Sequence, residues 1–211
     1  INDYTGNLVF IASVAATTGS RMPVSINLVY NGFQHGQNVD RPYNVGMGWR
    51  LDIQEKLTPI SSGGSGLQSA LYSSGYRFKY EDGDGTAHYF KLKSGYSSVY
   101  EDEEGMGLTL TVKETAENLV KYVIASDAGE QMSFTANGNL LKITDSDQNF
   151  IKIDYYSDGR VSCVRDGVDR KTVFTYGTGT ENAKRLQSIT DPSGRVTKFN
   201  YADFGCIHSI E

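Results

Sequence analysis

The feature that most constrains this chain is a repeat near its C-terminal end. Three eleven-residue segments begin with Asp and end with Tyr: 145–155 (DSDQNFIKIDY), 166–176 (DGVDRKTVFTY) and 191–201 (DPSGRVTKFNY). Gly138 and Gly159 lie seven positions before the first two aspartates, Lys184 holds that place in the third unit, and Gly205 opens a fourth unit. The first two aspartates are 21 positions apart and the next pair 25, because the third unit carries a four-residue insertion. A period in this range predicts an array of stacked supersecondary units.

Each repeat has the pattern of a β-hairpin. After the Asp, apolar and polar residues alternate up to the Tyr, which predicts a strand with one buried face. The segments before the aspartates (NLLKIT, RVSCVR and RLQSIT) are strand-like as well. Their apolar residues lie two and five positions past the residue that opens each unit, at 138, 159 or 184. These two positions differ in parity, so we expect either a β-bulge or a strand that is buried on both faces.

A tight turn is expected where each Asp stands. Asp suits the first position of a type I turn, Pro the second and Gly the fourth. The segment DPSG, which ends at Gly194, meets all three preferences. The expected turn residues are Asp145, Asp166 and Asp191. Stacked hairpins then predict one packed row formed by the tyrosines that end the repeats, Tyr155, Tyr176 and Tyr201.

The rest of the chain also has strand-like patterns. Strands are expected at 7–15 and 23–30, and from Trp49 through Ile53. Hairpins are expected at 75–92 and 108–125, although 113–123 also has the composition of a short helix. The predicted fold is all-β, a meandering antiparallel sheet of stacked β-hairpins that forms a partial, open spiral. We divide it into an opening β segment (1–57), irregular hairpins (58–137) and the repeats (138–211), within one continuous domain.

Composition excludes several classes of function. The formal net charge of −5 argues against a nucleic-acid-binding protein, which needs a basic surface. No apolar run reaches the roughly 18 residues of a membrane span. The first ten residues lack the basic start and apolar stretch of a secretory signal peptide.

Few residues suggest chemistry. The segments at 82–85 (DGDG) and 145–149 (DSDQN) resemble parts of calcium loops, but both lack the Gly and Glu that an EF-hand loop requires, so turns are favoured. The acidic run at 101–105 (EDEEG) is expected to be a solvated loop. His35, His88 and His208 have no neighbours at metal-ligand spacing, and no catalytic motif is present. We therefore predict no enzyme activity, no cofactor and no metal.

The two cysteines are expected to be free thiols. Cys163 lies four positions past its unit Gly and Cys206 lies one position past, so stacking does not bring them to equivalent places. Two buried or half-buried thiols are therefore favoured over a disulfide.

The repeat G-x6-D-x9-Y resembles the YD repeat of the Rhs family, which includes bacterial Rhs toxins, wall-associated proteins and teneurins. The resemblance covers 138–211. A second likeness, to the segment that opens bacterial YD arrays, lies in YTGNLVF, MPVSINLVYN and VGMGWRLD near the N-terminus. The resemblance implies a long β-sheet that closes into a shell around a C-terminal polypeptide, often a toxin, in a large secreted or surface-exposed bacterial protein.

Two functions follow as expectations. The first is a structural segment of such a shell, whose partner is the rest of its own parent chain: further repeats and a C-terminal cargo. This chain has only three complete repeats and so encloses nothing by itself. The alternative is a cell-surface β module that binds carbohydrate or cell-wall components through exposed aromatic residues such as Tyr43 or Tyr156.

Overall fold

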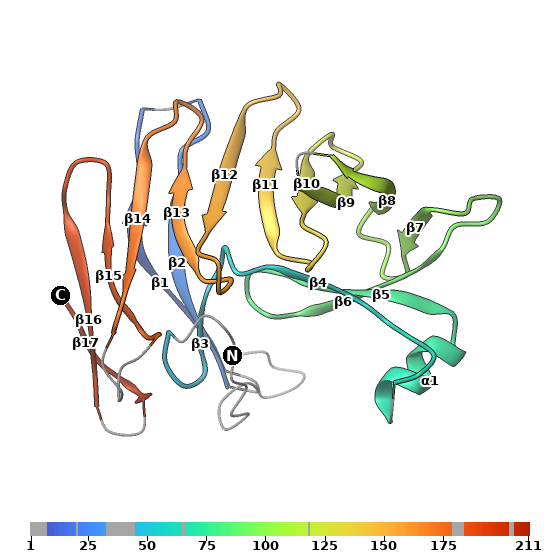
Figure 1. Ribbon diagram of the computed structural model, residues 1–211, viewed down its shortest axis with the longest axis horizontal. Coiled ribbons are helices and arrows are strands. Elements are labelled where there is room, and N and C mark those ends of the chain that lie inside the picture. The colour runs from blue at the N-terminus through green and yellow to red at the C-terminus, as the bar shows by residue number, and fades with distance from the viewer. Residues whose placement is uncertain are drawn as a thin grey trace. The chain divides into compact units, whose positions relative to one another are not determined.

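The computed structural model describes residues 8–19, 21–32, 45–64, 66–117, 119–178, 184–202 and 205–211 (Figure 1). These residues form strands and a single short helix, so the all-β prediction is confirmed. The strands make one three-stranded and one fourteen-stranded sheet. No helix in the described part of the chain is long and apolar enough to cross a membrane.

The three-stranded sheet comes from the N-terminal segment. It has the order β1-β2-β3 and is antiparallel throughout. Its strands are β1 (Val9–Ala16), β2 (Ser25–Asn31) and β3 (Trp49–Leu51). The strands predicted at 7–15 and 23–30 are therefore confirmed, with boundaries shifted by one or two residues.

The fourteen-stranded sheet is a meander, because its strand order follows the chain from β4 at one edge to β17 at the other. The sheet is open, as predicted. Its strands are β4 (Lys56–Pro59), β5 (Tyr76–Glu81), β6 (Ala87–Leu92), β7 (Val99–Asp102), β8 (Leu108–Glu117), β9 (Val120–Ser126), β10 (Gln131–Phe134), β11 (Leu140–Thr144), β12 (Phe150–Tyr155), β13 (Val161–Arg165), β14 (Lys171–Tyr176), β15 (Leu186–Thr190), β16 (Val196–Tyr201) and β17 (Ile207–Ile210).

The chain divides into two compact units. Unit 1 joins the two ends of the chain, 1–54 and 151–211, and unit 2 consists of 55–150. Unit 1 therefore contains the three-stranded sheet together with strands β12 to β17. Unit 2 contains strands β4 to β11 and the helix α1 (Leu67–Ser73).

The three repeats form the hairpins β11–β12, β13–β14 and β15–β16, and β17 begins the fourth unit. The pairing register shifts opposite each terminal Tyr: at Tyr155 against Val161, at Tyr176 against Leu186 and at Tyr201 against Ile207. A register shift of this kind marks a β-bulge, and it recurs at Phe134 against Leu140. The bulge required by the parity of the apolar positions is therefore present in every unit.

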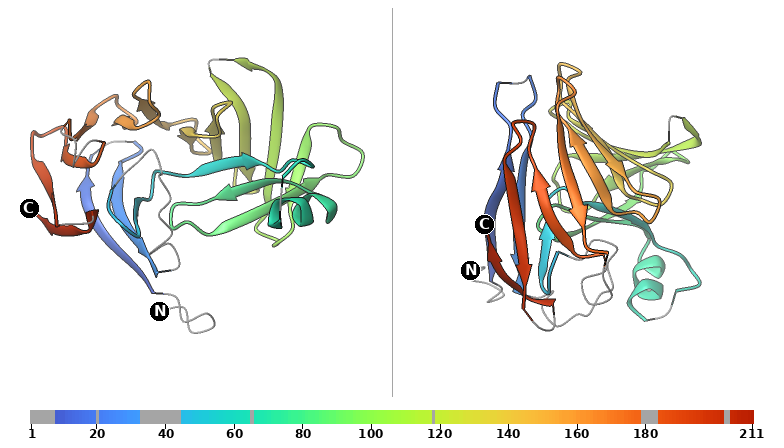
Figure 2. Two further views of the ribbon diagram at one scale, coloured as in Figure 1. Left: turned by 60° about the horizontal axis from the view of Figure 1, so that its bottom comes forward. Right: turned by 60° about the vertical axis from the view of Figure 1, so that its left-hand side comes forward.

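The core of unit 1 lies between its two sheets. The side chains eight positions past each repeat Asp are buried: Ile153, Phe174 and Phe199. On the three-stranded sheet, Ile26, Leu28 and Leu51 are fully buried. Figure 2 shows β1 and β2 (blue) beside the last strands of the repeats (orange and red). Burial of these apolar side chains is the main force holding the two sheets of unit 1 together.

Three side chains of the repeats also bind the backbone of the N-terminal segment. The Thr197 hydroxyl donates a hydrogen bond to the Val14 carbonyl at 2.8 Å. The guanidinium groups of Arg170 and Arg195 donate to the carbonyl oxygens of Thr18 (2.8 Å) and Ala16 (3.4 Å). These bonds satisfy carbonyl groups along β1 and just beyond it, and so tie the N-terminal segment to the repeats.

Two elements differ from the sequence prediction. The strand expected through Ile53 ends at Leu51, because the Asp52 carboxylate accepts hydrogen bonds from the backbone and side chain of Asn27 and turns the chain. The helix α1 was not predicted. It has seven residues, no capping side chain and no buried residue, so it lacks the amphipathic pattern by which helices are recognised.

The hairpin expected at 108–125 is confirmed as β8–β9, and the alternative of a helix at 113–123 is wrong.

Gly138 has both a conformational and a spatial role. Its φ is +76°, in the left-handed region that favours glycine. The Leu57 amide donates a hydrogen bond to its carbonyl oxygen at 2.9 Å. A Cβ at Gly138 would lie 1.8 Å from the Leu57 carbonyl oxygen, whereas a Cβ at Gly159, with φ +87°, would meet nothing within 4 Å. The two glycines therefore share a backbone conformation but differ in the space around them.

We predict that Gly138→Ala lowers the free energy of unfolding by about 2–5 kcal/mol, the sum of left-handed strain and a backbone displacement. The matched change Gly159→Ala is expected to cost only the strain, about 1–2 kcal/mol. Urea denaturation of both variants measures the difference. Equal losses would show that the contact with Leu57 adjusts without cost.

Candidate functional site

The repeat aspartates organise the turns of the sheet. In each repeat, the carboxylate oxygen Oδ1 accepts hydrogen bonds from the backbone N–H groups two and four residues later, at 2.8–3.1 Å. The residue three positions after the Asp, which is the fourth residue of the turn, donates its backbone N–H to the carbonyl oxygen of the Asp. This residue is Gln148, Asp169 or Gly194, and its φ is positive in each repeat. This is the pattern of a type I turn closed by a left-handed residue, so the predicted role of Asp145, Asp166 and Asp191 has a direct structural basis.

The second carboxylate oxygen of these aspartates binds the side chain four residues later, a contact that the sequence analysis missed. Asp145 Oδ2 accepts from Asn149 Nδ2 at 2.9 Å. Asp166 and Asp191 pair with the Nε atoms of Arg170 and Arg195 at 2.7 and 2.5 Å. An Asn or Arg four residues after a turn Asp was the available sequence signal. Burial alone would raise the pKa of the Asp166 carboxyl, but the backbone and guanidinium of Arg170 outweigh it and lower that pKa.

The glycines that open the units occupy the turns at the other ends of the hairpins. The N–H groups of Gly138, Gly159 and Gly205 donate to the carbonyl three residues earlier, and each glycine has a positive φ. Lys184 takes the same conformation, with φ +72°, at the end of the inserted loop. Both ends of the repeat hairpins therefore use one kind of turn.

The tyrosines that end the repeats are half-buried. The Tyr201 hydroxyl donates to the Leu186 carbonyl at 2.7 Å, and burial raises the pKa of its phenol. The guanidinium of Arg160 lies 4.6 Å from the centre of the Tyr176 ring, and that of Arg185 lies 5.5 Å from the Tyr201 ring. Tyr176 and Tyr201 are thus each covered by an arginine from the preceding connection, and the buried aromatic side chains of these two repeats, Phe174 and Phe199, lie two residues earlier.

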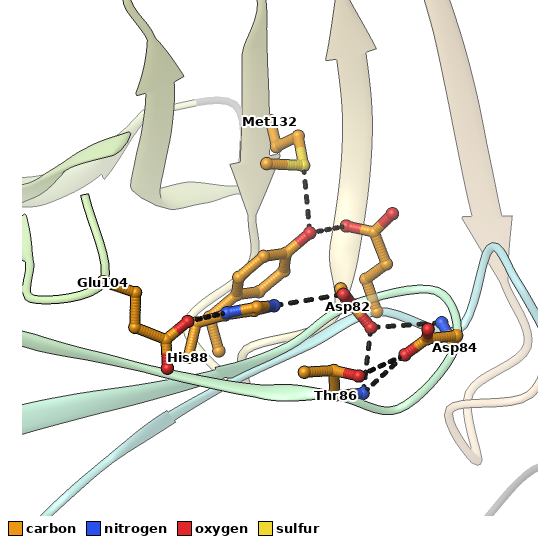
Figure 3. A network of polar contacts seen from close by, with 8 residues as sticks. Asp82, Asp84, Thr86, His88, Glu104 and Met132 are labelled. Carbon is orange, nitrogen blue, oxygen red and sulfur yellow. Dashed lines mark hydrogen bonds and ion pairs between the residues drawn. The ribbon is translucent and has the colours of Figure 1, made fainter. Parts of the chain in front are cut away.

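A polar network in unit 2 surrounds His88 (Figure 3). His88 lies on β6 and its side chain is only 7% exposed. Its Nε2 lies 3.0 Å from Asp82 Oδ2, and its Nδ1 lies 2.7 Å from Glu104 Oε2. A neutral imidazole has one N–H donor, whereas the protonated ring has two and satisfies both carboxylates.

Two causes act on the ionisation of His88. Burial by itself lowers the pKa of the imidazole, but its hydrogen bonds to the carboxylates of Glu104 and Asp82 outweigh burial, so the pKa is raised above its usual 6.5. Beside the histidine, the Tyr80 hydroxyl donates to Glu55 Oε2 at 2.6 Å and lies 3.4 Å from the Met132 sulfur. Both ring nitrogens of His88 therefore lie against carboxylates.

The two segments considered as calcium loops are hairpin turns. Asp82 Oδ1 accepts from the backbone N–H groups of Asp84 and Thr86, as in the repeat aspartates. Asp145 does the same in the segment 145–149. Within the described residues, no group of three or more His, Cys, Asp or Glu side chains is arranged to hold a metal ion.

The acidic run 101–105 is largely exposed, as expected, although its first two residues belong to β7 and its carboxylates have partners. Glu101 pairs with Lys93 at 3.9 Å, and Glu103 pairs with Lys91. The Asp102 carboxylate accepts a hydrogen bond from the Met106 amide at 2.6 Å. Glu104 pairs with His88, so each of the four acidic side chains of the run has a partner. Glu103 and Glu104 join the loop after β7 to residues of β6.

The remaining candidates are few. Cys163 and Cys206 are free thiols, as predicted, and burial together with the Asp154 carboxylate raises the pKa of Cys163. Tyr156 is 43% exposed, and Tyr43 and His35 lie outside the described residues. Trp49 is half-buried and packs edge-on against Phe10, with a ring distance of 6.1 Å, and on Tyr30 at 5.3 Å. It anchors an aromatic row on the three-stranded sheet.

No protein-family model matches the sequence, and no curated protein shows significant similarity to it. The resemblance to YD repeats therefore stays a prediction.

We predict that Asp166→Ala lowers the free energy of unfolding by about 2–3 kcal/mol near pH 7. Asp166 is 2% exposed, and its carboxylate binds two backbone amides and Arg170, so these donors would lose their partner. Asp166→Asn keeps an acceptor for the amides and is expected to cost less. The pKa of this carboxyl is lowered on folding, so the loss should shrink as pH falls below about 4. Denaturation at several pH values tests both points.

We also predict that His88 stabilises the fold most at low pH. Its pKa is raised on folding, so its contribution is complete below about 6.5 and is lost as pH rises through the higher folded pKa. The difference in unfolding free energy between the wild type and His88→Asn should therefore decrease from pH 6 to pH 9. His208→Asn, at an exposed position, serves as the control. A difference independent of pH would show that His88 acts by packing alone.

Proposed function

We propose that this chain is a non-catalytic wall segment of a large, secreted or surface-exposed bacterial repeat protein of the YD type. One observation carries the proposal. Three sequence repeats form three consecutive hairpins of one sheet, with the same turns, the same bulge and the same buried position. Units that each add one hairpin to a common sheet suit a protein that builds an extended surface.

The polar clusters support a structural role. The carboxylates of Asp166 and Asp191 hold backbone amides and arginines of their own turns. His88 is enclosed by two carboxylates, and a general base needs a free nitrogen within reach of its substrate. The carboxylates of Asp166 and Asp191 and the imidazole of His88 therefore hold turns and loops in place.

The proposed partner is the rest of the parent chain. In this proposal further repeats extend the sheet into a shell, and the shell encloses a C-terminal toxin or effector. The chain itself contributes wall: the turns at its edges keep each hairpin in register, and the buried row of Ile153, Phe174 and Phe199 seals one face of the sheet.

We predict that the purified parent protein, imaged by electron cryomicroscopy, shows these strands inside a continuous β-sheet wall. In that protein, Phe174→Ala should expose the enclosed segment to added protease, because the residue is fully buried in the wall. The matched change Val173→Ala, at an exposed neighbouring position, should leave protection intact. A parent in which these strands form a separate module on a linker would contradict the proposal.

A second candidate is a surface module that binds cell-wall glycan. Exposed aromatic rings favour it: Phe10 is 55% exposed and Tyr156 is 43% exposed. Aromatic faces of this kind stack on apolar faces of ligands. Binding on a glycan array that is lost in Phe10→Ala or Tyr156→Ala would support this candidate over the wall segment.

A further inference from the structure

His88 connects two loops of unit 2. Its imidazole lies between the carboxylate of Asp82, in the turn between β5 and β6, and that of Glu104, in the loop after β7 (Figure 3). The His88 side chain is 7% exposed, whereas that of Glu104 is 47% exposed. The buried ring is therefore the fixed side of this contact, and the glutamate reaches it from the surface.

The two carboxylates beside the ring are held differently. Asp82 Oδ1 accepts hydrogen bonds from the backbone N–H groups of Asp84 and Thr86, so this carboxylate is fixed by its own turn as well as by His88. Within the part of the chain that the structure describes, His88 is the one polar partner of the Glu104 carboxylate. A change in the imidazole therefore leaves Asp82 in place but removes the contact that holds Glu104.

The number of protons on the ring decides whether both contacts form. The protonated imidazole donates from both nitrogens, whereas the neutral ring has one N–H. That N–H is expected on Nε2, because Asp82 is a fixed acceptor at 3.0 Å. Nδ1 then directs a lone pair at Glu104 Oε2, 2.7 Å away, and two acceptors at this distance repel each other. The contact with Glu104 is thus the one that breaks.

We propose that His88 and Glu104 form a pH-operated latch, in which the protonated ring holds Glu104 and Gly105 against β6 and the neutral ring releases them. The latch belongs to unit 2 alone and stands apart from the proposed wall function. It is a local movement, because the strands on either side of the loop stay paired while Glu104 leaves the ring.

The loop has the geometry for such a movement. It is anchored on one side by the Glu103 N–H, which donates to the backbone of β6 at 3.4 Å. On the other side the Met106 N–H donates to the Asp102 carboxylate at 2.6 Å. Between these anchors, Gly105 has a φ of +74°, and a Cβ there would meet nothing within 4 Å. Glu104 and Gly105 can therefore move outward without breaking the pairing of β7 with β6.

The other titratable groups near His88 point elsewhere. Tyr80 on β5 lies beside the imidazole, with ring centres 5.8 Å apart, but its hydroxyl donates to Glu55. The carboxylate of Asp84 accepts from the amide and hydroxyl of its own turn. Burial lowers the pKa of His88, and the hydrogen bonds to the two carboxylates at its ring nitrogens outweigh burial and raise it. The proton that operates the latch is therefore the one shared with these two carboxylates.

The test follows the ring and the loop together, by NMR of the isotope-labelled whole chain between about pH 6 and pH 9. The nitrogen shifts of His88 should report a single titration that ends in the Nε2–H tautomer. Over the same pH range, the backbone order parameters of Glu104 and Gly105 should fall from about 0.85 to below about 0.6. The order parameter of Thr86, in the turn fixed by Asp82, should stay constant.

Glu104→Gln separates the latch from a general effect of pH. The new carboxamide can donate to an unprotonated Nδ1, so the loop is expected to stay ordered up to about pH 9. The midpoint of the His88 titration should also fall by about one pH unit, because one of its two carboxylates is gone. The matched control is Glu103→Gln, which changes the neighbouring carboxylate that pairs with Lys91 and should leave the pH-dependent release intact.

Four outcomes would overturn the proposal. The first is a loop that stays ordered while His88 titrates, and the second is a loop that is released at a midpoint different from that of the ring. The third is an Nδ1–H tautomer above the midpoint, which would mean that the contact with Asp82 opens instead. The fourth is a Glu104→Gln variant that keeps the pH-dependent release. The first three are read from the wild type and do not depend on how the variants fold.

Discussion

The structure depends on one recurring turn. In each repeat, an Asp carboxylate accepts two backbone N–H groups, and the residue three positions after the Asp adopts a left-handed conformation. This turn sets the register of the two strands it joins, and a register error of one residue would place every buried side chain in solvent. Strands β12 to β17 are joined by these Asp turns, by the glycine turns that end at Gly159 and Gly205, or by the longer loop that ends at Lys184. The buried row therefore stays aligned across the hairpins.

The same turn explains why the carboxylates of its aspartates hold the chain in place. A carboxylate with two amide donors and an arginine has little capacity left for a ligand, and Asp166 is almost completely buried in this state. His88 lies beside a turn of the same kind, where Asp82 uses one oxygen for backbone amides and the other for the imidazole. The histidine then joins that turn to Glu104 in the loop after β7. Polar groups in this protein hold chain segments in place, which agrees with the proposed role as a wall.

Much of the repeat region could be predicted from the sequence. The hairpins, the first and fourth turn positions and the bulge follow from residue preferences and from parity, and all are local along the chain. The helix α1 could not be predicted, because seven residues without a cap or a buried face leave no pattern. The end of β3 depends on Asp52 reaching Asn27, 25 residues away. The network of His88 needs Glu104, 16 residues away, and no spacing rule connects the two.

The sequence by itself determined the all-β class, the hairpin unit and its turns, because alternation and turn chemistry act between residues that are close along the chain. Only the tertiary structure decided which surfaces meet. It joined the N-terminal three-stranded sheet to the last repeats, through contacts such as Thr197 with Val14, which are 183 positions apart. It also closed the edge of β4 with Gly138. Such pairings depend on which apolar faces and strand edges remain uncovered after the hairpins form, and that information is not local.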